Sequence, residues 1–163
     1  MINFLSEKDT IDWLEKHYIN NYHLVKENDK ILVDVSNHVS LFDHHLDKIP
    51  VLFRNVDGDF SVSHNNLTSL KGCPEYIKGS FSCNSNLLNS LEFGPEYVGG
   101  GYDFCGNSVE NFDFLAKYIG GWLFAGNNPL KKVDLSNTVL IEKFSHVLEK
   151  NENNLKINEL ANQ

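Results

Sequence analysis

Histidine and aspartate side chains recur in this chain at a spacing that could bring them together for chemistry. His38 and Asp59 lie 21 residues apart, and so do Asp43 and His64. If the chain repeats with that period, each imidazole has a carboxylate beside it, which can orient a general base or help to hold a metal ion. The pairs lack a nucleophile at a distinctive turn and lack His-x-x-x-His spacing, and polar pairs on neighbouring strands are common without any chemistry. We therefore expect no catalytic residue, no metal and no cofactor. An enzyme that uses the His–Asp pairs is a minor alternative.

The composition excludes several other classes of function. The chain has 163 residues, of which 41% are hydrophobic, and this is enough for one domain with a modest core. Its 14 basic and 22 acidic residues give a net charge of −8, which argues against a nucleic-acid binder and against docking on an anionic membrane. Three cysteines are too few for a disulfide scaffold. We see no signal peptide and no membrane-spanning run, and we expect a cytoplasmic protein.

A repeat of 21 residues dominates the sequence and would position these side chains. Four glycines and four asparagines mark two of its columns: Gly58, Gly79, Gly100 and Gly121, and Asn65, Asn86, Asn107 and Asn128. Apolar residues alternate just before each asparagine, which predicts a short strand that buries every second side chain. The asparagine amides are expected to form a structural ladder that satisfies backbone groups of neighbouring coils. The glycines predict either a positive φ or close packing between coils.

The order of residues within one unit resembles a known family. In 102–112 it is apolar, any, apolar, any, any, Asn, any, apolar, any, any, apolar. This resembles the leucine-rich repeat, in the short version of bacterial effectors and uncharacterised bacteriophage proteins. The resemblance implies a solenoid of about five coils with a short parallel β-sheet. Pro74 and Pro95 share a column on the opposite, convex side, where we expect no strand.

Capping units are expected at both ends of the solenoid, giving an α+β protein overall. Residues 1–37 are interpreted as an N-terminal cap, with a helix over 7–19 and a strand over 30–35. The helix would begin after Ser6 and bury Ile11, Leu14 and Tyr18 on one face. The solenoid itself is assigned to 38–135, with a short helical turn predicted for 114–119. Residues 136–163 would form a C-terminal capping helix over 138–150 and a polar tail.

The side chains that alternate with the buried strand positions should face outward from the sheet. Seven of them form the candidate partner-binding set: Phe42, His38, Asp59, His64, Asp103, Trp122 and Phe124. Trp122 and Phe124 are the strongest candidates, because exposed aromatic residues contribute much of the binding energy in interfaces. The alternative is that the C-terminal helix covers both and makes them part of the cap. Five strands give a face of roughly 300 Å², short of the ~800 Å² that each partner contributes to a standard interface, so loops or caps must take part.

These observations favour a non-enzymatic protein-binding module. The resemblance implies a bacteriophage or bacterial protein that binds and inhibits a host protein, such as a defence factor, in the host cytoplasm. Two other functions stay open: a sponge or sensor for a small molecule or nucleotide, and a self-assembling structural component. We expect neither a nucleic-acid nor a membrane partner, and the sequence leaves the partner's identity and the oligomeric state open.

Overall fold

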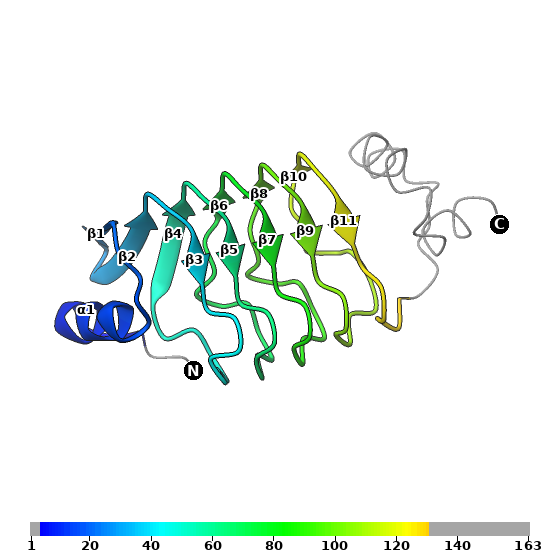
Figure 1. The fold of residues 1–163 in the computed structure, drawn as a ribbon, viewed down its shortest axis with the longest axis horizontal. Helices are drawn as coiled ribbons and strands as arrows, with labels where there is room; N and C mark the ends of the chain where they lie inside the picture. The colour runs from blue at the N-terminus through cyan, green and yellow to red at the C-terminus, as the bar shows by residue number, and fades with distance from the viewer. Residues whose placement is uncertain (1–3, 131–163) are drawn as a thin grey trace.

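The computed structural model describes residues 4–130, which form a parallel β-solenoid of about four turns with a spacing of 21 residues (Figure 1). Two sheets run along the solenoid, and the chain crosses from one to the other in each turn. The five-stranded sheet contains β3 (Val39–Ser40), β5 (Phe60–Ser61), β7 (Phe81–Ser82), β9 (Tyr102–Asp103) and β11 (Leu123–Phe124). The six-stranded sheet contains β1 (Tyr22–Glu27), β2 (Lys30–Val35), β4 (Leu52–Val56), β6 (Tyr76–Ile77), β8 (Tyr97–Val98) and β10 (Tyr118–Ile119).

Residues at the same repeat position pair directly between neighbouring coils. Phe60 pairs with Phe81, and Phe81 pairs with Tyr102, in parallel register. Their rings are fully buried and follow one another along the core, with centroid distances of 6.1 Å and 4.8 Å. No coil could bury these rings alone, so the stacking of coils creates the core.

The four asparagines of the repeat lie in a row, and each bonds to the backbone of two coils. The Nδ2 of Asn86 donates to the carbonyl oxygens of Val62 (2.9 Å) and Cys83 (3.1 Å). Its Oδ1 accepts a hydrogen bond from the backbone N–H of Leu67 at 3.0 Å. Equivalent bonds are made by Asn65, Asn107 and Asn128. Each amide thus replaces the ladder bonds that the backbone loses where the strand ends.

The glycine column exists because neighbouring coils approach closely. A Cβ added at Gly58 would lie 2.7 Å from the backbone nitrogen of His38, which real Cβ atoms do not tolerate. Gly58 does not have a positive φ, since Gly72 and Gly106 are the described glycines that do. Close packing, one of the two explanations that the sequence left open, is therefore the reason.

The side of the solenoid that carries Pro74 and Pro95 differs from the prediction. We expected no strand there, but β6 and β8 begin two residues after these prolines and belong to the six-stranded sheet. A strand of two residues needs few backbone donors, and the prolines lie just outside it. The predicted helical turn over 114–119 is also wrong, because this segment contains a turn and then β10, as in the preceding coils.

The N-terminal unit closes one end of the solenoid. Helix α1 (Glu7–Lys16) begins after Ser6, whose Oγ accepts a hydrogen bond from the N–H of Asp9, and it buries Leu14. The helix ends earlier than predicted, and Tyr18 is 86% exposed with a φ of 58°, so its assignment to the buried face is wrong. The predicted strand over 30–35 is β2, which pairs in parallel with β4. Strand β1, which was not predicted, lies antiparallel to β2 and covers its outer edge. The predicted C-terminal helix lies outside the described residues.

Candidate partner-binding surfaces

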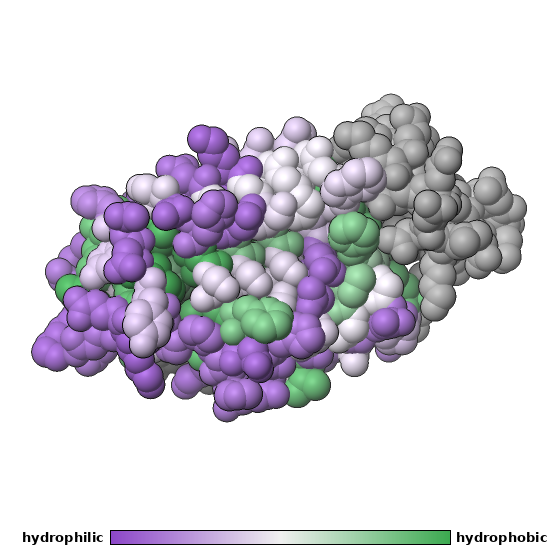
Figure 2. Space-filling view, viewed as in Figure 1, coloured by the Kyte–Doolittle hydropathy of each residue, from purple (hydrophilic) through white to green (hydrophobic). Residues whose placement is uncertain are grey.

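The outer face of the five-stranded sheet carries the side chains singled out from the sequence. Its middle is small and polar, and these groups bond mainly to one another. The hydroxyls of Ser63 and Ser82 are 2.8 Å apart, and the Asp103 carboxylate accepts hydrogen bonds from the Asn84 amide (2.7 Å) and the Cys105 N–H (3.0 Å). Figure 2 shows this face with pale side chains along its middle and green ones toward its C-terminal end.

The structure brings one of the two predicted His–Asp pairs together. His38 Nδ1 lies 3.2 Å from the Asp59 carboxylate and also accepts a hydrogen bond from the Asp59 N–H at 2.9 Å, with both side chains more than half exposed. The Asp43 carboxylate instead faces His45, at 3.7 Å, and the His64 ring packs against Phe42.

Asp43 and His64 occupy one repeat position and share a left-handed backbone, with φ values of 55° and 56°, so the corner itself repeats from coil to coil. The second pair is absent because the two side chains contact other residues, His45 and Phe42. Within residues 4–130, no group of three or more His, Cys, Asp or Glu side chains is arranged to hold a metal ion.

Three aromatic side chains stand at the ends of this face. Phe42, at the N-terminal end, is 52% exposed, while Trp122 and Phe124, at the other end, are 48% and 40% exposed. The helix that was weighed as their cover falls among residues that the structure does not describe. Their role in binding therefore stays a prediction.

The cysteines are arranged as hydrophobic residues and not as reactive groups. Cys73 and Cys83 are buried, and burial raises the pKa of both thiols. Partial burial, together with the hydrogen bond to the Asp103 carboxylate, raises the pKa of Cys105 to about 11. A thiol becomes a good nucleophile only as the thiolate, which these environments disfavour.

The six-stranded sheet carries a second surface, which the sequence analysis missed. Tyr76, Tyr97 and Tyr118 occupy one repeat position and stack as a tyrosine ladder, with ring centroids 4.6 Å and 4.7 Å apart and ring planes within 10°. The parallel register imposes this spacing, because identical residues of neighbouring strands lie side by side. Partial burial, with smaller effects from the phenols on either side, raises the pKa of Tyr97. The recurrence at 21 residues was visible in the sequence, but that side of the coil was expected to lack strands.

A groove with a volume of about 690 Å³ lies next to the tyrosine ladder. Phe93 and Phe114, at one repeat position, line it and are 52% and 53% exposed. The Lys71 ammonium stands 5.7 Å from the ring centroids of both Phe4 and Phe93, within the range of a cation–π contact. We call the tyrosine ladder together with Phe93 and Phe114 the aromatic face.

A column of charged residues separates the groove from the ladder. Arg54 binds the Asp34 carboxylate through Nε and Nη2 and the Glu27 carboxylate through Nη1. The Arg54 guanidinium holds the pKa of Asp34 below its ordinary value. At the other end of the column Lys117 pairs with Glu96 at 2.6 Å. Glu75 lies between these pairs, lines the groove, and forms no ion pair within the described part of the chain.

The described part of the chain contains no helix with the length and hydropathy needed to cross a membrane. Comparison with protein-family models, with curated proteins and with solved structures finds no match. Two surfaces therefore remain as candidates. The outer face of the five-stranded sheet is polar in its middle and has exposed aromatic side chains at its ends, whereas the aromatic face has large side chains exposed beside a groove.

Proposed function

We propose that this chain is a non-enzymatic protein-binding module that uses its aromatic face. The observation that carries the proposal is the group of large aromatic side chains that are exposed at the groove and next to it. The exposed fractions are 37% for Tyr76, 47% for Tyr118, 52% for Phe93 and 53% for Phe114. Exposed aromatic residues in such a group mark binding surfaces on soluble proteins. They also lose little conformational entropy on binding, since the solenoid fixes their backbone and each side chain has only two rotatable bonds.

The size of the aromatic face supports a protein partner. A buried aromatic side chain contributes ~200 Å², so four that are about half exposed contribute roughly 400 Å². The charged column and the groove walls can supply the rest of the ~800 Å² that one partner buries in a standard interface. The outer face of the five-stranded sheet also exposes three large aromatic side chains, but they are divided between its two ends, and polar groups that bond to one another lie between them.

The charge of the chain indicates the kind of partner. A net charge of −8 favours a partner with a basic surface and speeds its association at low salt. The unpaired carboxylate of Glu75 offers a local contact for a cationic side chain. The repeat pattern further supports the assignment to short leucine-rich-repeat proteins of bacteriophage or bacterial origin that block a host protein in the cytoplasm. This finer assignment rests on resemblance.

The test compares substitutions on the two faces against one purified partner. The partner is first captured from host cells with the wild-type chain and is then titrated against each variant. Phe93→Ser combined with Phe114→Ser should weaken binding by at least about 30-fold, since a hot-spot residue contributes ~2 kcal/mol or more. Leu87→Ser is the control and should bind like the wild type, since Leu87 is 60% exposed and belongs to neither surface. Trp122→Ser tests the outer face of the five-stranded sheet.

Two results would overturn the proposal. One is a partner that binds the double variant as tightly as the wild type, or that loses affinity only with Trp122→Ser. The other is that no protein binds saturably, while the sedimentation of the chain depends on its concentration and so shows self-assembly. Thermal unfolding of each variant shows whether a loss of binding comes from a folding defect. Substitution of half-exposed side chains should change the stability little.

A further inference from the structure

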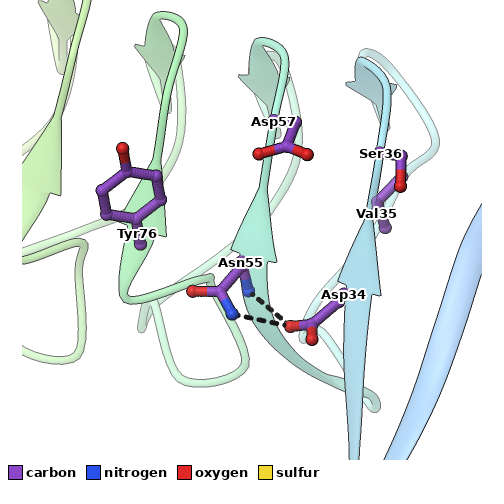
Figure 3. Close-up of a pocket in the computed structure, with 6 residues that line it drawn as sticks. All are labelled: Asp34, Val35, Ser36, Asn55, Asp57 and Tyr76. Carbon is purple, nitrogen blue, oxygen red and sulfur yellow. Dashed lines mark hydrogen bonds between the residues drawn. The ribbon is translucent and has the colours of Figure 1, made fainter.

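The tyrosine ladder stops one ring short at its N-terminal end. Asn55 pairs in register with Tyr76, at the repeat position that Tyr97 and Tyr118 occupy in the following coils. Tyr97 therefore has a parallel ring on each side, whereas Tyr76 has one on one side only. Where a further ring would stack, the shorter Asn55 leaves a pocket of about 410 Å³ between β2, β4 and β6 (Figure 3).

The groups that face this pocket can accept hydrogen bonds. The Asn55 Nδ2 donates to the Asp34 carboxylate at 2.9 Å, so the amide oxygen is left over, and Figure 3 shows it turned toward Tyr76. Asp57 and Ser36, which directly follow β4 and β2, add a carboxylate and a hydroxyl to the lining. No ion pair involves Asp57 among residues 4–130, although Lys78 occupies the same repeat position in the next coil.

The pocket has one free negative charge. Asp34 also lines it, but its carboxylate is already bound by the Arg54 guanidinium and by the backbone and side chain of Asn55. The charges of Asp34 and Arg54 compensate each other, so the carboxylate of Asp57 is the uncompensated negative charge of the pocket. The acidic balance of the whole chain adds to the attraction for a cation.

We propose that this pocket binds the guanidinium group of an arginine side chain on the partner protein. This inference rests on the proposed function, and it names the chemistry that part of the aromatic face recognises. A guanidinium is flat, so it can stack on the open face of the Tyr76 ring and continue the ladder. Its five N–H donors match the acceptors of Asn55, Asp57 and Ser36.

Other ligands fit the pocket less well. An anion would meet the Asp57 carboxylate. A lysine ammonium has the right charge, but it is a compact and strongly hydrated group that cannot stack as a plane. A neutral aromatic ring could continue the stack, but it would leave the carboxylate and the amide oxygen without donors and would cost their hydration.

The experiment follows the backbone amide signals of the isotope-labelled full chain during titration with three small probes. These are the N-acetyl methylamides of arginine, of citrulline and of lysine, where citrulline has the shape of arginine without its charge. We expect saturable, millimolar shifts at Asn55, Asp57 and Tyr76 with the arginine probe. The lysine probe should bind more weakly, and the citrulline probe should leave these signals in place.

Two substitutions test the residues, and a third serves as a control. Asp57→Asn should weaken binding of the arginine probe about tenfold, as expected for the loss of one charge-assisted hydrogen bond. Asn55→Tyr should abolish the shifts by filling the missing ring position. Asp47→Asn makes the same change of charge at an exposed site and should have no effect.

The outcomes separate the two proposals. Equal shifts with citrulline and arginine, or equal affinities for Asp57→Asn and Asp47→Asn, would overturn the arginine site. If the captured partner also binds Asp57→Asn as tightly as the wild type, the arginine site fails while the protein-binding function stands. If the arginine probe binds as expected but no protein saturates the aromatic face, the protein-binding function fails, and with it the claim that the arginine belongs to a partner.

Discussion

Tyr102 provides a test of the core that runs against the usual direction of mutational effects. Its side chain is fully buried, and its hydroxyl has no hydrogen-bond partner among the described residues. An unsatisfied buried polar group costs ~1–3 kcal/mol relative to its hydration in the unfolded chain. Tyr102→Phe removes that cost and keeps the ring contacts to Phe81 and Phe104, whose centroids lie 4.8 Å and 5.9 Å away. The hydroxyl lies next to Gly94, and the small void left there offsets part of the gain.

We therefore expect Tyr102→Phe to raise the free energy of unfolding by about 1 kcal/mol. Urea unfolding followed by far-UV circular dichroism and by tryptophan fluorescence measures it, and coincidence of the two curves shows whether the coils unfold together. Tyr118→Phe is the matched control, since its side chain is 47% exposed and the change should stay within about 0.5 kcal/mol. A loss of stability in Tyr102→Phe would refute the reasoning, because the hydroxyl would then contribute more through its contacts than its missing hydrogen bond costs.

Two further predictions concern the amide ladder and the N-terminal unit. Asn86→Ala should lower the free energy of unfolding by about 3 kcal/mol or more, because it leaves buried backbone groups of two coils unsatisfied. Urea titration measures this change, and a loss below about 1 kcal/mol would contradict the prediction. Burial, with smaller effects from His44 and Lys16, lowers the pKa of His17, whose Nδ1 lies 2.7 Å from His44 Nδ1. The unfolded chain then binds more protons than the folded one, so stability should be full above the ordinary histidine value of 6.5 and should fall as the pH drops below it. His17→Gln should flatten this dependence while His23→Gln leaves it intact, and equal slopes in all three proteins would refute it.

The repeat made one half of the fold predictable. Asn65 and Asn86 lie 21 residues apart in sequence and at equivalent positions of adjacent coils in space, so the alternating residues before them located the five-stranded sheet. Strand β2 of the six-stranded sheet was predicted, but β6 and β8 were missed. Each of them buries a single residue, Ile77 or Val98, so no alternation marks it, and each follows a proline. Parallel pairing with the preceding strand of the sheet, β4 for β6 and β6 for β8, holds them extended, and not local propensity.

On the candidate surfaces too, the repeat spacing predicts some contacts and not others. The pair of His38 and Asp59 follows from the repeat spacing alone, because both residues lie on the regular part of the coil. The pair of Asp43 and His64 does not form, although the two residues share the same backbone conformation, because their side chains contact His45 and Phe42, and these contacts do not follow from the repeat spacing. The repeat spacing also places Tyr76 beside Tyr97, and the second sheet adds the strand register that holds their rings nearly parallel.

The uniform length of the repeat also bears on how such a protein can change over generations. Each coil bonds only to its two neighbours, and every contact along the tyrosine ladder is between equivalent positions. An in-frame duplication or loss of one unit within the array would lengthen or shorten the tyrosine ladder by one ring and leave the remaining contacts as they were. Strand β1 prevents such growth at the N-terminal end, because it runs antiparallel where another coil would have to pair in parallel. The extent of the aromatic face can thus evolve independently of the chemistry at the pocket beside Asn55, which lies at the fixed end.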